Sequence, residues 1–292
     1  MSGLTMLMHL FRERLSLREL ARVPEPQLIM DGPVQAGAFT EIGREDGILA
    51  AIYFFHALQI SPLVRSGDTV LDLGCGPANQ LAQVARLNPQ ARFIGLDASP
   101  AMLELAHATV QRSKLDNVEL IEGDMTRLAS IGTGEVDCVT CTMSLHHLPN
   151  VAALHLAMRE ARRVLKTDGG AYFADFGRLR RIATLRFFAH DRADCQSAQF
   201  TEDYFNSLRA AFSVKEMAIA SALLGPGMIR HRTALAPFMV VIKSHSRRRL
   251  DAPTRQLAQQ TFSGLTTELQ RDFRLFARWF RLAGLALPYA PE

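Results

Sequence analysis

The stretch Val70-Leu71-Asp72-Leu73-Gly74-Cys75-Gly76-Pro77 decides the fold of this 292-residue chain. Its first half is a short apolar run, which predicts a buried β-strand, and its glycines predict a tight turn that leads into a helix. Glycine in such a turn lets the backbone approach a ligand closely and leaves amide groups free at the start of the helix. The stretch therefore predicts a turn that binds a nucleotide.

Around this turn, short apolar segments alternate with amphipathic segments of helical length. The predicted strands are Thr69–Leu73, Arg92–Leu96, Val118–Ile121, Val136–Thr142 and Ala171–Phe176. The predicted helices are Asn79–Arg86, Pro100–Arg112 with Ser99 as its N-cap, and Val151–Leu165, which ends in a turn over Lys166–Gly170. This alternation predicts a Rossmann-like α/β fold, with a mostly parallel sheet covered by helices on both faces.

After Phe176 the pattern changes. We predict a basic helix over Arg178–His190 and a second helix over Thr201–Phe212, capped by Thr201. The strands Val214–Ala220 and Phe238–Ile242 would form an antiparallel hairpin that completes a seven-stranded sheet. We assign residues 61–245 to the core, residues 1–60 to an N-terminal helical extension or lid, and residues 246–292 to a C-terminal helical extension.

The charges around the turn indicate which kind of nucleotide it binds. Asp97 closes the second predicted strand, where a carboxylate can accept hydrogen bonds from both hydroxyls of a ribose. A nicotinamide dinucleotide site would have a third glycine where this chain has Asn79. Asp72 would repel a pyrophosphate and attract the ammonium and sulfonium groups of S-adenosylmethionine. The residues therefore favour the sulfonium cofactor.

The order of motifs resembles the class I S-adenosylmethionine-dependent methyltransferases. The resemblance begins at the turn and continues through Gly95-Leu96-Asp97-Ala98-Ser99-Pro100, Glu122-Gly123-Asp124-Met125, Ser144-Leu145-His146-His147-Leu148-Pro149 and Leu165–Gly170. One departure is Ala78-Asn79, where many relatives have another glycine or a threonine. The two extensions match no pattern that we can name.

This resemblance implies a set of residues that contact the cofactor. The glycine turn would pass under the methionine portion, Asp97 would hold the ribose, and Asp124 would receive the adenine amino group. The predicted cofactor-binding residues are Asp72, Gly74, Cys75, Gly76, Asp97, Ala98, Met102, Asp124, Met125, Thr142 and Met143. The donor would be S-adenosyl-L-methionine and the product S-adenosyl-L-homocysteine.

Three residues are candidates for catalysis. His146 and His147 follow the fourth predicted strand, at the carboxyl edge where α/β sheets bind ligands. A neutral imidazole can take a proton from a hydroxyl group or a ring nitrogen. A helix cap or a hydrogen bond to the backbone is the structural alternative, and it is favoured for His147. Asp175 ends the fifth predicted strand and would orient either a histidine or the substrate, or anchor a loop.

The predicted lid contains the aromatic segment Tyr53-Phe54-Phe55-His56. We predict that Tyr53 and Phe54, together with His146, contact the methyl acceptor. Burial on an amphipathic helix explains the aromatic residues almost as well. His56 fits a surface or core histidine better than a base.

The C-terminal helix has two distinct faces. Phe273, Phe276 and Phe280 form a stripe that would be buried, and arginines at 271, 274, 278 and 281 form a basic face. A solvated face explains these arginines better than nucleic acid binding, because no known RNA-binding module accompanies them.

Composition indicates an ordinary soluble protein with a formal charge of +4. The apolar run over residues 4–11 lacks the flanks of a signal peptide, and no stretch reaches the ~18 apolar residues of a membrane helix. Cys138 and Cys141 lie three apart on a predicted strand, so their sulfurs cannot converge on a metal ion. We therefore predict a cytoplasmic protein with no bound metal, no membrane association and a possible homodimeric state.

Together these features predict a methyltransferase that modifies an oxygen or nitrogen atom of a small molecule, such as a secondary metabolite. Nothing after the fourth strand resembles the Asn/Asp-Pro-Pro-Tyr/Phe motif of enzymes that methylate amino groups of nucleic acid bases. Two alternatives stay open: a methyltransferase of RNA or protein, and an interaction protein that binds the cofactor without turnover.

Overall fold

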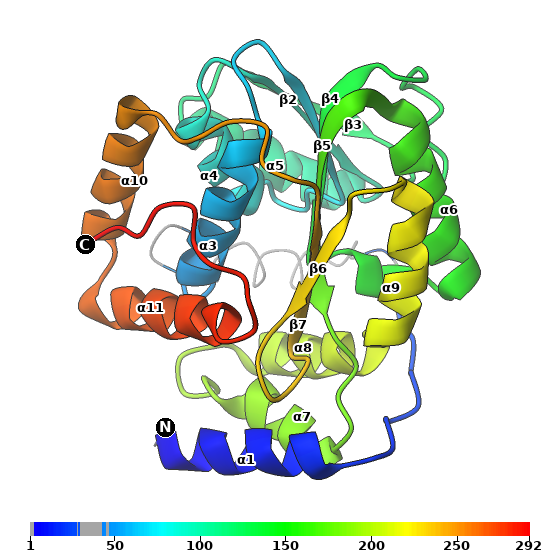
Figure 1. Cartoon of the computed structure of the whole chain (residues 1–292), viewed down its shortest axis with the longest axis vertical. Helices are drawn as coiled ribbons and strands as arrows, with labels where there is room; N and C mark the ends of the chain where they lie inside the picture. Colours follow the sequence, from blue (N-terminus) through cyan, green and yellow to red (C-terminus); the bar gives the residue numbers. More distant parts are fainter. Residues whose placement is uncertain (1–2, 28, 30–42, 45–46) are drawn as a thin grey trace.

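The computed structural model describes residues 3–27, 29, 43–44 and 47–292, and a seven-stranded sheet lies at its centre (Figure 1). The strands are β1 (Thr69–Leu73), β2 (Arg92–Asp97), β3 (Val118–Glu122), β4 (Val136–Thr142), β5 (Leu165–Phe176), β6 (Ile229–Arg232) and β7 (Met239–Lys243). Their order is β3-β2-β1-β4-β5-β7-β6, and only the pairs β5–β7 and β6–β7 are antiparallel. The predicted Rossmann-like architecture is confirmed.

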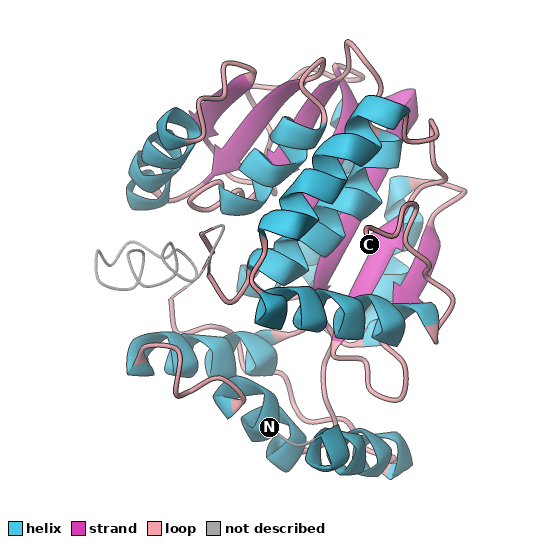
Figure 2. Cartoon of the chain, turned by 90° about the vertical axis from the view of Figure 1, so that its left-hand side faces the viewer, coloured by secondary structure: helices cyan, strands magenta, loops and turns pink. Residues whose placement is uncertain are grey.

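Helices cover both faces of the sheet, and a further group lies across one end (Figures 1 and 2). The first face carries α3 (Ala50–Ile60), α4 (Asn79–Leu87), α5 (Pro100–Arg112), α10 (Ala252–Gly264) and α11 (Thr267–Arg281). The second face carries α6 (Val151–Val164) and α9 (Val214–Ser221). The end group consists of α1 (Gly3–Leu15), α7 (Ile182–His190) and α8 (Ala198–Ala210).

Alternate residues of each strand are buried in opposite halves of the core, as the pleat of a strand requires. Val70 and Cys138 pack with α3, α4 and α11, whereas Leu71 and Val139 pack with α6 and α9. Both faces of the sheet are thus covered by helices and shielded from water, which explains why these strands are near-continuous apolar runs. The two sulfurs of Cys138 and Cys141 fall on opposite sides of the sheet, as predicted.

The predicted strand over Val214–Ala220 is wrong, because this segment forms α9. Ser213 accepts a hydrogen bond from the backbone of Glu216, and the Glu216 side chain accepts one from the backbone of Ser213. This capping box starts a helix whose buried residues, Met217 and Ala220, are three apart. The outer strand of the hairpin is instead β6, which follows the Gly225-Pro226-Gly227 loop.

Three predicted boundaries also differ from the structure. The helix expected from Arg178 begins at Ile182, and the helix expected from Thr201 begins at Ala198, with Ser197 rather than Thr201 as its N-cap. The turn expected over Lys166–Gly170 belongs to β5, whose pairing with β4 shifts register there.

The two flanking helical segments are part of the same packed structure. Phe54 and Phe55 of α3 lie in one core cluster with Phe276 and Phe280 of α11, beneath the sheet residue Tyr172. The predicted burial of the phenylalanine stripe on α11 is therefore confirmed, and the arginines beside it are exposed. No helix within the described ranges has the length and hydropathy needed to cross a membrane.

Candidate active site

A cavity of ≈ 400 Å³ opens at the carboxyl ends of β1 to β4. We call it the glycine-turn cavity, because residues 74–77 form its floor. Every residue predicted to contact the cofactor lines it, and Tyr53, Gln80, Ser144 and His147 complete much of the wall. Its size lies within the range of small-molecule and cofactor sites.

Gly74 is required by the conformation and crowding of the turn. It has a φ of +65°, and a Cβ added to it would lie 2.5 Å from Oγ of Ser144. The Ser144 hydroxyl donates a hydrogen bond to the Gly74 carbonyl at 2.7 Å. The turn after β1 is thereby fixed against the loop after β4, and a side chain would push them apart.

Two carboxylates stand beside this turn. Asp97 accepts hydrogen bonds from the backbone of Gly76 at 2.7 Å and of Ser99 at 2.9 Å. Asp72 accepts one from the Thr140 hydroxyl at 2.6 Å. Burial, together with the charge of Asp97, raises the pKa of Asp72 to about 7 despite that hydrogen bond. A cationic ligand would favour the ionised form of Asp72.

The end of β4 shows local strain and an unsatisfied polar group. Met143 has a φ of +53°, which a non-glycine side chain rarely adopts, and such strain is concentrated at functional sites. The hydroxyl of Thr142 is buried and has no hydrogen-bond partner within the part of the chain that the structure describes. Both residues line the glycine-turn cavity, where a polar ligand could satisfy that hydroxyl.

A second cavity of ≈ 210 Å³ adjoins the first and shares Met143 and His147 with it. We call it the aromatic cavity, because rings from the sheet, from α7, α8 and α11, and from the loop before β7 surround it. These rings belong to Phe176, Phe188, Phe200, Tyr204, Phe238, Phe276 and Trp279. The cavity therefore suits an apolar, ring-containing ligand.

His146 and Asp175 form a buried pair on the wall of the aromatic cavity. Nδ1 of His146 lies 2.7 Å from Oδ1 of Asp175, whose Oδ2 accepts the His146 backbone N–H at 2.9 Å. Burial alone would lower the pKa of His146, but the charge and hydrogen bond of Asp175, with Glu25 nearby, outweigh it and raise the pKa. Asp175 thus holds the proton on Nδ1 and leaves Nε2 as the nitrogen that can react or ligate.

His147 lies beside His146, with ring centroids 4.4 Å apart. Its burial and the neighbouring His146 hold its pKa well below the usual value, so the ring is neutral. Its Nδ1 is buried and accepts or donates no hydrogen bond among the described residues. A helix cap, the structural alternative for this residue, is excluded because Asn150 caps α6.

The comparisons with known proteins fall on the segment that builds most of the glycine-turn cavity. Residues 70–169 match a family model described as a methyltransferase domain. A demethylmenaquinone methyltransferase of Listeria welshimeri is 35% identical over 107 residues, 36% of this chain and 44% of that protein. A ubiquinone biosynthesis O-methyltransferase of Acinetobacter baumannii is 27% identical over 113 residues, 39% of this chain and 46% of that protein.

Solved structures share the fold at low sequence identity. A SAM-dependent methyltransferase from Aquifex aeolicus superimposes with a TM-score of 0.52 at 15% identity, covering 73% of this chain and 97% of that one. An O-methyltransferase family protein from Burkholderia thailandensis gives a TM-score of 0.51 at 18% identity, covering 68% of this chain and 57% of that one. The chain contains a class I S-adenosylmethionine-dependent methyltransferase domain.

The cofactor of this methyltransferase domain is S-adenosylmethionine, and the glycine-turn cavity fits it. Asp72 and Asp97 offer negative charge and ribose acceptors, and the free hydroxyl of Thr142 lies on the same wall. The domain spans less than half the length of the two curated relatives described above. Outside it, the end helices and α11 supply most of the aromatic cavity.

The aromatic segment of α3 contributes one residue to the glycine-turn cavity and the others to the core. Tyr53 lines the glycine-turn cavity, and burial raises its pKa. Phe54, predicted at the acceptor site, instead packs against Phe262 and Phe273 and lines neither cavity. His56 is a core residue whose Nδ1 lies 2.6 Å from the Tyr172 hydroxyl, and burial lowers its pKa to about 3.

Most of the residues on the far side of the aromatic cavity were not predicted from the sequence. Phe188, Tyr204 and Trp279 come from three separate helices, and Glu25 comes from the segment after α1. The aromatic residues had a weak signal, since each lies on the apolar side of an amphipathic helix. No sequence pattern pointed to Glu25, because it belongs to no helix or strand.

Proposed function

We propose that this protein transfers the methyl group of S-adenosylmethionine to an oxygen or nitrogen atom of a small molecule, such as a secondary metabolite. The supporting observation is the wall common to the glycine-turn cavity and the aromatic cavity, formed by Met143 and His147. A donor in the first cavity and an acceptor in the second would meet at this wall. Holding the two reactants close and in line accounts for much of the catalysis of such a reaction.

The lining of the aromatic cavity favours an acceptor with a ring. Phe188, Phe238 and Trp279 stand close to one another, with the Phe238 and Trp279 rings stacked at 5.4 Å between centroids. Stacked aromatic side chains favour a flat apolar group over a peptide or a nucleic acid backbone. The relatives named for demethylmenaquinone and for ubiquinone biosynthesis are consistent with a small-molecule acceptor.

The cofactor supplies a methyl group on a sulfonium, which is a good leaving group. The chain would contribute positioning, exclusion of water and, for a hydroxyl acceptor, removal of a proton. Nε2 of His146 would take that proton, and Asp175 would stabilise the imidazolium that results. The electron pair of the acceptor oxygen would form the new bond to carbon as the carbon–sulfur bond breaks. S-adenosylhomocysteine and the methylated acceptor would leave, and the proton would pass to solvent.

A labelled-methyl assay tests this function. Purified protein is incubated with methyl-labelled cofactor and either a panel of hydroxylated and aminated aromatic compounds or a lysate separated into metabolites, RNA and protein. We expect the label to appear in small molecules. Label found only in RNA or protein would overturn the proposal, and so would cofactor binding without any turnover.

The variant His146→Ala tests the role of the base. We expect kcat to fall by about 10²–10⁴-fold for a hydroxyl acceptor, because a positioned general base contributes that much. His107→Ala, which removes an exposed histidine of α5, is the matched control and should keep full activity. Turnover of His146→Ala at the rate of this control would leave His146 without a catalytic role.

We also propose that the protein works in the cytoplasm. Cys75, Cys138, Cys141 and Cys195 are all free thiols, and three of them are buried. A reducing compartment fits this pattern. Labelling with a thiol-reactive probe under native and unfolding conditions should give modification of Cys195 alone in the folded protein.

A further inference from the structure

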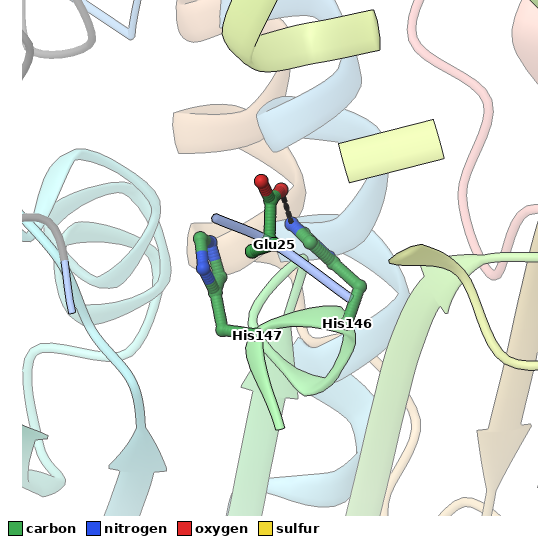
Figure 3. Close-up of side chains that lie close together, drawn as sticks. All are labelled: Glu25, His146 and His147. Atoms are coloured by element: carbon green, nitrogen blue, oxygen red, sulfur yellow. Dashed lines mark ion pairs between the residues drawn. The ribbon is translucent and has the colours of Figure 1, made fainter. Parts of the chain in front are cut away.

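Three side chains with metal-binding atoms lie close together at the edge of the aromatic cavity, which both histidines line: Glu25, His146 and His147 (Figure 3). One ligand atom from each lies within 4.8 Å of the others. The two histidines come from the loop after β4, and Glu25 comes from the N-terminal segment that crosses it. The side chains of Glu25 and His146 are 7% and 4% exposed, so water screens them little.

The separation between Glu25 and His146 is too long for a direct hydrogen bond. Nε2 of His146 lies 4.0 Å from Oε1 of Glu25, beyond the range of such bonds. Two ligands of one tetrahedral metal ion lie about 3.4 Å apart when each metal bond is about 2.1 Å long. A side-chain shift of roughly 0.6 Å would therefore bring the two atoms into one coordination sphere.

The surroundings of His146 are those of a metal-binding histidine. Asp175 accepts the proton of Nδ1, which turns the lone pair of Nε2 toward Glu25. A histidine that binds a metal almost always donates its other ring N–H to a carboxylate or a carbonyl in this way. Asp175 therefore fixes both the tautomer and the direction of the ligand.

His147 and Glu25 each add a feature that a bound ion would explain. His147 has a buried Nδ1 without a hydrogen-bond partner in the described chain, which is an energetic cost that coordination through this nitrogen would offset. Glu25 is held in place by the Ser207 hydroxyl, which donates to its Oε1 at 2.7 Å. Neighbouring residues therefore hold at least two of the three candidate ligands, Glu25 and His146, in fixed positions.

Arg22 anchors the segment that carries Glu25. Its guanidinium donates hydrogen bonds to the carbonyls of Ala210 at 2.7 Å, Pro149 at 2.7 Å and His146 at 3.0 Å, and it lies 4.1 Å from the centre of the Phe212 ring. The N-terminal segment is thus tied directly to the histidine loop. A carboxylate and two imidazoles from distant parts of the chain are held together.

We propose that Glu25, His146 and His147 bind a divalent transition-metal ion such as Zn²⁺. Two histidines and a glutamate are the donor set of a catalytic zinc site, which keeps an open position for a water molecule or substrate. Both histidines line the aromatic cavity, so that position would face the acceptor.

The role of this ion rests on the proposed function. A hydroxyl group bound to the open position would lose its proton to solvent more readily, because the cation stabilises the resulting oxygen anion. That oxygen would then form the bond to the methyl carbon as the carbon–sulfur bond breaks. With Nε2 engaged by the metal, acidification by the ion would replace proton removal by His146.

Direct metal binding tests the site without any methyl transfer. Purified protein, stripped with a chelator and dialysed, is titrated with Zn²⁺ and with Co²⁺ as a spectroscopic probe, and bound metal is measured by mass spectrometry. We expect one ion per chain and a visible Co²⁺ spectrum typical of nitrogen and oxygen ligands. Failure of the unaltered protein to retain either metal would overturn the proposal.

Substitutions of the proposed ligands test whether the ion binds at this site. Glu25→Gln and His147→Ala should lose stoichiometric binding, and Asp175→Asn should weaken it by about 10–100-fold as a residue that orients a ligand. His245→Ala, at an exposed histidine outside both cavities, is the matched control and should bind as the unaltered protein does. Circular dichroism checks that each variant folds.

Unaltered affinity in both Glu25→Gln and His147→Ala would also overturn the site. The two proposals fail separately, because methyl transfer by protein that binds no metal would overturn only the metal site. Stoichiometric metal in a protein that methylates nothing would overturn only the proposed function.

Discussion

At the scale of a single residue, a contact between Asp72 and the cofactor would make cofactor affinity depend on pH. Its pKa is raised to about 7, mainly by burial, and a cationic ligand favours the ionised carboxylate. Binding of S-adenosylmethionine should therefore release a proton near neutral pH. We expect the affinity to fall by up to about tenfold for each pH unit below 7. Titration calorimetry in buffers of different ionisation enthalpy measures both effects.

The variant Asp72→Asn should remove this pH dependence, and Asp116→Asn, at an exposed position, should keep it. Protonation of Asp72 should have opposite effects on folding stability and on cofactor affinity. Because the folded-state pKa is raised, protonated Asp72 stabilises the ligand-free protein at low pH, and this contribution is lost as the pH rises through about 7. Asp72→Asn should thus gain in melting temperature relative to the unaltered protein as the pH rises from about 4 to about 7, and the gain should stay constant above that. Parallel melting curves would contradict the shifted pKa.

Substitution of Gly74 can separate the cost of a steric clash from the cost of backbone strain. Gly74→Ala would place a Cβ 2.5 Å from Oγ of Ser144 at a φ of +65°, whereas Gly134→Ala has the same φ and nothing within 4 Å. Strain alone costs about 1–2 kcal/mol. We expect both variants to lose that much unfolding free energy in a denaturant titration, and only Gly74→Ala to lose more and to bind S-adenosylmethionine weakly. Equal stability and cofactor affinity in the two variants would show that the Ser144 side chain moves to accommodate the added Cβ.

At the scale of elements, the strands of the parallel sheet were predictable because burial on both faces makes them continuous apolar runs. The outer hairpin was not. β6 is a four-residue edge strand with a single apolar residue, Ile229. α9 is an eight-residue segment, too short for its apolar spacing to distinguish helix from strand. The capping box Ser213-x-x-Glu216 was the available signal. For the site, residues at strand ends were predictable from local sequence, whereas Glu25, Phe188 and Trp279 meet only through tertiary packing.

The capping box of α9 gives a prediction at this scale. Ser213→Ala removes the acceptor for the Glu216 backbone N–H at the start of the helix, which should cost about 1 kcal/mol of unfolding free energy. Ser246→Ala, at an exposed serine, should change the free energy by less than about 0.5 kcal/mol. Urea titrations followed by circular dichroism compare the two. An equal effect of both substitutions would mean that α9 is held by packing alone.

At the scale of the whole molecule, α11 connects the stability of the fold to the aromatic cavity. Its inner residues pack on α3, where the Phe280 ring stacks on Phe55 at 5.1 Å between centroids, and its Trp279 lines the aromatic cavity. The Trp279 indole also donates a hydrogen bond to the Ala234 carbonyl at 2.5 Å, which ties α11 to the loop between β6 and β7. The wall of the aromatic cavity therefore depends on a helix that follows the methyltransferase domain in the sequence.

If α11 belongs to the cooperative core, Phe280→Ala should lower the unfolding free energy by about 3–5 kcal/mol, as for other buried aromatic residues. Leu282→Ala is the control, since Leu282 is 70% exposed and its loss should cost less than about 0.5 kcal/mol. Trp279 is the single tryptophan, so its fluorescence reports on α11 while far-ultraviolet circular dichroism reports on all helices. We expect the two signals to change at the same denaturant concentration in the unaltered protein and in both variants. A tryptophan transition that comes first would mean that α11 unfolds separately, and the aromatic cavity would then be lost before the glycine-turn cavity.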